Sequence, residues 1–149
     1  MDRRKMIGAL GAAGAASFAL ARNVSGQERN RRTLRHATMR NPVDQECLDA
    51  CVRCEIACNE MVHHCLMQAG NGVKEHVRVA EIALTCQEFC GLAAKLIARS
   101  CEMRNETCQL CAKVCDACAD ECEKNEADKE MMACDEVCRQ CAAACRKMA

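Results

Sequence analysis

The chain has 149 residues, with 21 Lys plus Arg, 21 Asp plus Glu, no Trp or Tyr, two Phe and 17 Cys. This length supports a single domain with one modest core. The balanced charge excludes the basic excess that would attract nucleic acid or an anionic membrane, whereas a cysteine content above a tenth of the chain is far outside ordinary globular usage.

The first 21 residues have the pattern of an export signal. Arg3 and Arg4 precede a small and apolar run from Gly8 to Leu20, as in a twin-arginine signal, and cleavage is expected after Ala21. The run is too short to span a bilayer, for which about 20 residues are needed. We therefore predict that residues 1–21 direct export to the periplasm by the twin-arginine route, with no permanent membrane span.

Residues 22–42 are polar and rich in Arg, and Pro42, the only proline, closes them, so we predict a flexible lead-in segment. Residues 43–149 are rich in Ala, Leu, Glu, Lys, Met and Gln, which favour helices. Short connections between the predicted helices favour an all-α fold, an antiparallel up-down four-helix bundle. Turn signals, strongest at Gly70 and Gly72 and softer at Asn or Asp residues near 105 and 125–128, bound helices over about 43–69, 73–102, 105–124 and 127–148.

The cysteines repeat at helical spacing. The pattern C-x₃-C-x₂-C-x₃-C begins at Cys47, Cys111 and Cys134, and steps of three and four residues keep side chains on one face of a helix. The interval of 11 residues from Cys90 to Cys101 corresponds to about three turns. Since the residues between the cysteines are often charged, we predict that all 17 thiols lie on four helical stripes facing the interior and bind metal there. The predicted ligands are Cys47, Cys51, Cys54, Cys58, Cys65, Cys86, Cys90, Cys101, Cys108, Cys111, Cys115, Cys118, Cys122, Cys134, Cys138, Cys141 and Cys145.

Buried thiols can serve as small hydrophobes, as disulfide partners or as metal ligands. Packing alone does not account for them, because larger apolar side chains would each stabilise the core by about 1.5 to 3 kcal/mol. Disulfides between residues three or four apart on one helix have poor geometry, but bridges between helices stay open. Soft thiolates bind Cu(I), zinc and iron–sulfur clusters, and Cu(I) accepts low coordination with shared thiolates, up to on the order of one ion per cysteine. We therefore predict high-capacity Cu(I) storage, with a general zinc or heavy-metal sink and a disulfide-stapled structural bundle as alternatives.

The sequence does not indicate an enzyme. Glu60 and His63 have the i, i+3 spacing of a di-iron site, but such a site needs a second copy and further inward glutamates, which the sequence lacks. A thiol oxidoreductase would use one isolated C-x-x-C in a βαβ context. A copper chaperone would normally bind one ion at an exposed site, so cysteines spread along four helices favour storage over delivery.

The repeated cysteine pattern, with Cys86, Cys90 and Cys101 in the second stretch, closely resembles that of the bacterial copper storage proteins over about residues 43 to 148. The resemblance implies Cu(I) storage inside a four-helix bundle and a homo-oligomer, a tetramer. A copper-requiring protein that receives the stored ions is a further expected partner.

Residues near the bundle ends are candidates for metal entry and auxiliary ligation. Met61 and Met131 extend the cysteine stripes with soft thioethers, although Met also fills gaps in cores, and His76 is expected at the same end. His63 and His64 cannot both face inward, so at least one is predicted to lie on the surface. The resemblance implies a second entrance at the opposite end, formed by His36, Met39 and Met148.

Overall fold

A computed structural model describes residues 40–148. The chain divides into two units, Met1–Arg40 and Asn41–Ala149, and the described residues beyond Arg40 belong to the second. The predicted export signal and the lead-in segment up to residue 39 lie outside the described residues, so both stay predictions.

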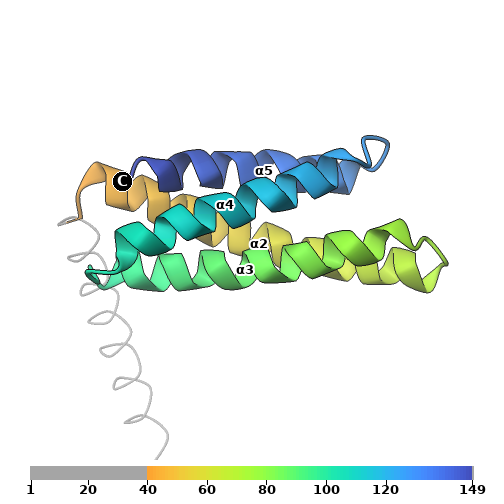
Figure 1. Ribbon diagram of the computed structural model, residues 1–149, viewed down its shortest axis with the longest axis horizontal. Helices are drawn as coiled ribbons and strands as arrows, with labels where there is room; N and C mark the ends of the chain where they lie inside the picture. Colours follow the sequence, from red (N-terminus) through yellow and green to blue (C-terminus); the bar gives the residue numbers. More distant parts are fainter. Residues whose placement is uncertain (1–39, 149) are drawn as a thin grey trace, which may run out of the picture. The chain divides into compact units, whose positions relative to one another are not determined.

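Four α-helices follow one another along the described residues (Figure 1). They are α2, Pro42–Gly70; α3, Glu75–Ala98; α4, Arg104–Glu123; and α5, Lys129–Arg146. Each helix packs against its neighbours in sequence, and α5 closes the ring by packing against α2. The predicted all-α four-helix bundle is therefore confirmed. No helix of residues 40–148 is both long and apolar enough to cross a bilayer.

Asn41 and Pro42 begin α2. The side chain of Asn41 accepts a hydrogen bond from the backbone N–H of Asp44 at 2.8 Å, and Pro42 occupies the first turn, where a helix does not use the missing N–H. Pro42 therefore starts the helix rather than closing the segment before it. At the other end of α2, the chain turns through Gly72, whose φ of 93° favours glycine.

The α3 helix ends at Ala98, before the predicted limit near residue 102. Ser100 adopts a left-handed φ of 53°; its N–H donates to the carbonyl of Ile97 at 3.0 Å, and the N–H of Cys101 donates to that of Leu96 at 2.9 Å. These two bonds close the helix in a Schellman motif. The prediction that Cys101 continues the stripe of α3 is therefore wrong, because this residue lies on the connection to α4 and is partly exposed.

Thiols make up most of the interior of the bundle. Sixteen of the seventeen cysteines are buried, and we call these sixteen the thiol column. The α3 helix contributes only Cys86 and Cys90, and larger or smaller apolar residues such as Val79, Ala93 and Ile97 fill the rest of its inner face.

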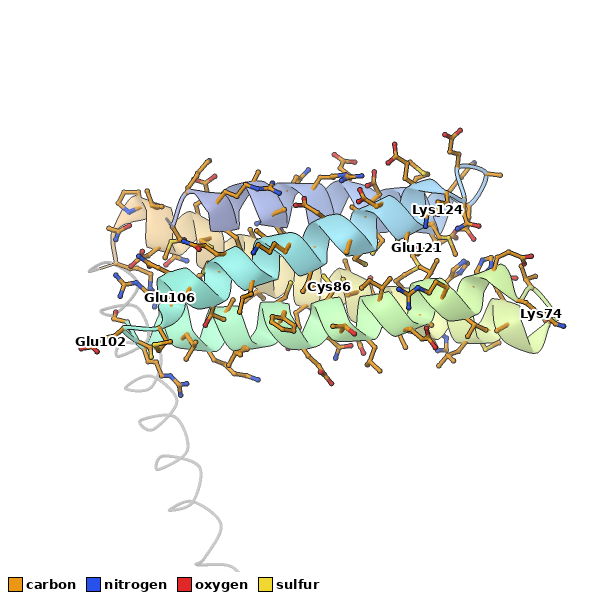
Figure 2. All side chains as sticks on the ribbon, viewed as in Figure 1. Lys74, Cys86, Glu102, Glu106, Glu121 and Lys124 are labelled. Carbon is orange, nitrogen blue, oxygen red and sulfur yellow. The ribbon has the colours of Figure 1, made fainter. Side chains whose placement is uncertain are left out.

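Charged side chains cover the outer faces of the helices (Figure 2). Lys74, Glu106 and Lys124 project into solvent, whereas Cys86 lies between the helices. None of the charged residues that lie between cysteines of the same helix is buried. The predicted phase of the helices, with cysteines inside and charges outside, is therefore confirmed for the sixteen cysteines of the thiol column.

Candidate metal centre

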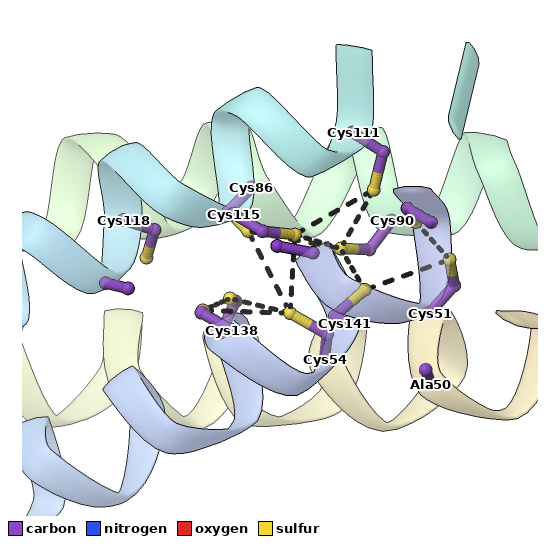
Figure 3. Packing of buried hydrophobic residues seen from close by; sticks show 14 of the residues in the cluster. Ala50, Cys51, Cys54, Cys86, Cys90, Cys111, Cys115, Cys118, Cys138 and Cys141 are labelled. Carbon is purple, nitrogen blue, oxygen red and sulfur yellow. Dashed lines mark hydrogen bonds between the residues drawn. The ribbon is translucent and has the colours of Figure 1, made fainter. Parts of the chain in front are cut away.

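Thiols from all four helices converge in the middle of the bundle (Figure 3). The sulfur of Cys54 in α2 lies 3.7 Å from that of Cys138 in α5, 3.9 Å from that of Cys115 in α4 and 4.0 Å from that of Cys86 in α3. The sulfurs of Cys86 and Cys115 are themselves 3.6 Å apart. This convergence follows from the steps of three and four residues, which keep each stripe facing the interior along its helix.

The thiols form overlapping groups of four, in each of which all sulfur atoms lie within 4.8 Å of one another. Each group in the series shares two thiols with the next. A thiol that belongs to two groups can therefore be a ligand at either of two neighbouring metal positions. Five of these groups, in order of overlap, are Cys51, Cys111, Cys141 and Cys145; Cys90, Cys111, Cys115 and Cys141; Cys54, Cys86, Cys90 and Cys115; Cys54, Cys58, Cys86 and Cys138; and Cys58, Cys118, Cys134 and Cys138.

Sulfur contacts continue beyond these groups toward both ends of the bundle. At one end, the sulfur of Cys47 lies 3.8 Å from that of Cys108 and 3.7 Å from that of Cys145. At the other, the thiol of Cys65 donates to the thioether sulfur of Met61 at 3.6 Å. The column of soft ligands thus extends through most of the bundle's length.

All seventeen cysteines are free thiols. The contacts between sulfurs of the thiol column, such as 3.6 Å for Cys86 and Cys115, are far longer than the roughly 2.05 Å of a disulfide bond. The disulfide-stapled alternative therefore has no support among residues 40–148, and every thiol of the column is available as a ligand.

Protonation of the thiols depends on their neighbours. Contact with Cys122 lowers the pKa of Cys118, whereas contact with Cys118 raises the pKa of Cys58, as expected when hydrogen-bonded thiols share protons. Burial raises the pKa of Cys65 to about 11, because the thiolate loses its hydration. A metal ion that enters the column must displace thiol protons, so its uptake depends on pH.

The predicted auxiliary ligands that lie among the described residues are all buried. Met61 and Met131 belong to the core cluster together with the cysteines, and so does Met148 near the end of the chain. His76 is 7% exposed. His36 and Met39 lie outside the described residues, and a ligand role for any of these side chains stays a prediction.

His64 and His76 meet at Asp128. The Nε2 atoms of the two histidines lie 2.8 and 3.0 Å from the same oxygen, Oδ2 of Asp128. The other oxygen, Oδ1, accepts hydrogen bonds from the N–H groups of Glu130 and Met131 at 3.0 and 3.1 Å and caps α5. Burial acts to raise the pKa of Asp128, but these hydrogen bonds outweigh burial and hold it well below its usual range.

The contact between Asp128 and the histidines could not be predicted, because it joins three elements that are far apart in the sequence. The turn pattern indicated only that a residue near 125–128 caps a helix. His63 is exposed and His64 is half-buried, so the prediction that the two do not both face inward is confirmed. Glu60 is also exposed, so Glu60 and His63 do not form an inward-facing metal pair.

Comparison with known proteins agrees with this geometry. Among solved structures, the chain is similar to the Cu(I)-bound copper storage protein BsCsp3, with 32% identity over 72% of this chain and 98% of that chain and a TM-score of 0.65. It is also similar to the apo form of copper storage protein 3 from Bacillus subtilis, with 32% identity over 70% of this chain and 97% of that chain and a TM-score of 0.61.

A third structure, Ccsp from Streptomyces lividans loaded with 10 copper equivalents, is 27% identical over 71% of this chain and 83% of that chain, with a TM-score of 0.66. A search of the curated proteins found no match. The family model described as copper storage protein matches residues 40–149, which include the whole bundle. The chain therefore belongs to the copper storage protein family.

Proposed function

We propose that this chain stores many Cu(I) ions on the thiol column. The overlap of the four-thiol groups carries this proposal, because each pair of neighbouring groups shares two sulfurs. Shared thiolates suit a soft ion of low coordination number, which can be bound by two or three sulfurs and leave the others free to bridge. Two similar structures, one described as Cu(I)-bound and one as loaded with 10 copper equivalents, support the same cargo here, and the family is one of storage proteins rather than enzymes.

The charge balance of the reaction also favours Cu(I). Each Cu⁺ that binds can replace one thiol proton, so the net charge of the buried core does not change when one ion enters per thiol. Burying an unbalanced charge would be costly in an interior of low dielectric constant. A divalent ion bound to four thiolates would leave two negative charges at each site.

The same thiols would bind fewer zinc ions than Cu(I) ions. A closed zinc site takes four ligands in a tetrahedron, and sixteen buried thiols divided into unshared sets of four would hold four zinc ions. Zinc ions in two neighbouring groups would compete for the two shared sulfurs. The geometry therefore favours copper storage over a general zinc sink.

Anaerobic titration of the reduced residues 22–149 with Cu(I), against a competing chelator and beside a parallel zinc titration, tests this function. We expect uptake of roughly ten or more Cu(I) ions per chain and of about four or fewer zinc ions, which Cu(I) then displaces. Saturation at one or two copper ions, or zinc that copper cannot displace, would refute storage.

We propose that the sixteen thiols of the column are the main ligands and that Met61 and Met131 add thioether ligands. Both methionines are buried among the cysteines, and thioether sulfur is a soft Cu(I) ligand. Substitution by Leu preserves the volume of the side chain, so loss of affinity for the last ions bound in Met61→Leu and Met131→Leu would support ligation. Unchanged affinities would assign both residues to packing. Cys101, His76 and Met148 stay candidate ligands, and the same measurement of Cu(I) affinity in substituted chains would test them.

We propose export to the periplasm through the twin-arginine signal at Arg3 and Arg4, which would carry the bundle across the membrane already folded with its thiols reduced. Fractionation of cells that express the full chain and the Arg3→Lys, Arg4→Lys double variant tests this route. The processed chain is expected in the periplasm only with both arginines, and equal export of the double variant would count against the route. A copper-requiring protein of the same compartment is the proposed recipient of the stored ions.

We propose that the chain forms a homo-oligomer, a tetramer as the resemblance implies. Apolar side chains lie exposed on the outer faces of α2 and α3, among them Ile56, Leu66, Leu84 and Leu92. Exposed apolar patches of this kind often mark interfaces in symmetric assemblies. Light scattering should give four times the monomer mass for the native sequence and a lower mass for Ile56→Glu combined with Leu66→Glu; a monomer in both cases would contradict the proposal.

A further inference from the structure

A groove of about 280 Å³ lies between α2 and α5, and we call it the α2–α5 groove. Ala57 of α2 and Ala133 of α5 line it, and their small side chains leave open a seam that larger residues would fill. Met61 and Cys134 also line the groove. The same opening thus gives access to a thioether and to a thiol of the column.

Cys134 has the most accessible thiol of the column. It is 3% exposed, whereas each of the other fifteen buried cysteines is 0% exposed. Met61, which contacts Cys65 through its sulfur, is also 3% exposed. A copper ion that enters the α2–α5 groove therefore meets Met61 and Cys134 before any of the fifteen fully covered thiols of the column.

At the nearby end of the bundle, the described residues offer no such access. A hollow of about 500 Å³ lies there, but its lining consists of polar residues and Ala127, with no Cys or Met. His64 and His76 each hydrogen-bond to Asp128 at this end, and His64 also lines the α2–α5 groove. Cys65 lies close enough for the charge of Asp128 to raise its pKa, yet it has no exposed surface.

Among the described residues, the opposite end exposes no thiol of the column either. Cys47, whose sulfur contacts those of Cys108 and Cys145, is 0% exposed, as are those two cysteines. Met148 of the same core cluster is 5% exposed. Within residues 40–148, Cys101 on the connection from α3 to α4 is partly exposed but lies outside the column, so the side of the bundle gives the more direct route to a thiol of the column.

We propose that Cu(I) enters and leaves the thiol column through the α2–α5 groove, with Met61 and Cys134 as its first protein ligands. This proposal rests on the storage function proposed above and names the transfer site. The incoming species is a Cu(I) ion bound to a small ligand. Its bond to that ligand breaks, a bond to the sulfur of Cys134 forms, the thiol proton passes to water in the groove, and copper stays in the +1 state.

The position of Cys134 explains how copper would move inward. Cys134 belongs to a four-thiol group with Cys58, Cys118 and Cys138, and both Cys58 and Cys138 also belong to the next group. Exchange of an ion between neighbouring sulfurs therefore needs no step longer than the 4.8 Å that bounds each group. Transfer along shared thiols leads from the groove to the middle of the column.

The rim of the groove suits a cation in transit. Glu60 and Glu130 line the groove and are exposed. Their carboxylates attract a positive ion at long range, but hard oxygen is a poor ligand for soft Cu(I). The rim therefore concentrates copper without trapping it, and the sulfur ligands inside the groove capture it.

Filling the groove tests the proposal directly. Ala133→Leu and Ala57→Leu keep a strong helix former at each position and place a larger side chain in the seam. Anaerobic stopped-flow mixing with Cu(I) in acetonitrile-containing buffer would follow the copper–thiolate absorbance. We expect the first loading phase to slow by about tenfold in each variant, while the final number of bound ions and the helical content match those of the native sequence.

Two matched variants complete the experiment. Ala143→Leu makes the same substitution at an exposed position of α5 outside the groove, and His76→Asn removes a histidine from the polar end. Ala143→Leu should load at the native rate, whereas His76→Asn tests entry at the polar end, which would slow this variant alone. The proposal is overturned if Ala133→Leu and Ala57→Leu load as fast as the native chain, if Ala143→Leu slows equally, or if only His76→Asn slows. Failure of the native chain to bind copper would instead refute the storage function.

Discussion

Cys54 and Cys138 are 84 residues apart in the sequence, yet their sulfur atoms lie 3.7 Å apart in the middle of the bundle. Each of the two residues belongs to two of the overlapping four-thiol groups. A metal ion bound at either group would therefore use a sulfur that the neighbouring position also uses. Loss of either thiol would therefore affect two neighbouring metal positions.

Substitution of a shared thiol should lower the number of bound Cu(I) ions more than substitution of an isolated thiol does. We predict that Cys54→Ser lowers the capacity by about two Cu(I) ions per chain, because the lost sulfur bridges two positions. Cys101→Ser, at the partly exposed cysteine outside the column, should leave the capacity of the column unchanged. Titration against a chelator measures both, and equal losses in the two variants would contradict the bridging model.

Copper should stabilise the bundle strongly. The apo core holds thiols where larger apolar side chains would contribute more burial energy. An ion that binds only the folded state raises the free energy of unfolding by about 2.7 kcal/mol when its free concentration is 100 times its dissociation constant. Thermal unfolding followed by circular dichroism should therefore show a clear rise in Tm with each addition of Cu(I). A Tm that does not depend on copper would mean that the ions bind outside the folded core.

Alkylation should distinguish Cys101 from the column. In the apo protein at pH 8, iodoacetamide should modify the partly exposed Cys101 first. Cys65, whose pKa burial raises to about 11, would have about one thiol in a thousand ionised at that pH, and its reaction should accelerate only as the pH approaches 11. Peptide mass spectrometry measures the order of modification, with urea-unfolded protein as the control in which all sites react. Equal rates for Cys65 and Cys101 in the folded state would contradict the buried column.

Asp128 should stabilise the fold through two roles, as cap of α5 and as acceptor for His64 and His76. We predict that Asp128→Ala destabilises the apo bundle by about 1 to 3 kcal/mol and that Asp128→Asn, which still caps a helix, costs less. Urea unfolding at neutral pH measures the two losses of free energy. Equal losses would show that the cap contributes little.

The lowered pKa of Asp128 also predicts a pH dependence. A carboxyl group whose pKa is lower in the folded state contributes stability above its unfolded pKa of about 3.9, and this contribution is lost as the pH falls further. The native sequence should therefore lose stability below about pH 4 more steeply than Asp128→Asn. Parallel pH profiles for the two proteins would contradict the charged interaction.

Spacing alone was sufficient to predict most of the bundle and of its metal-binding interior. Steps of three and four residues fix the face of a helix whatever its neighbours are, so Cys54, Cys118 and Cys138 could be assigned to the interior before the helices were paired. Cys101 could not be placed in this way. The preceding helix ends at Ala98, and Ser100 just beyond it adopts a left-handed conformation with no glycine or proline to signal it.

Features that depend on the pairing of helices could not be predicted from the sequence. The α2–α5 groove exists because Ala57 and Ala133 line the same seam, and the contact of Asp128 with His64 spans 64 residues. Neither residue pair has a periodic signature. The register between antiparallel helices decides both, and this register results from packing of the whole core.

The positions of copper ions in the loaded protein would show whether the thiol column stores them. We propose anomalous diffraction at the copper edge from crystals of reduced residues 22–149 loaded anaerobically with Cu(I). We predict a row of copper ions inside the bundle, with neighbouring ions bridged by shared thiols such as Cys54, Cys58 and Cys138. Copper confined to surface histidines, or one or two isolated ions in the core, would contradict storage on a continuous thiol column.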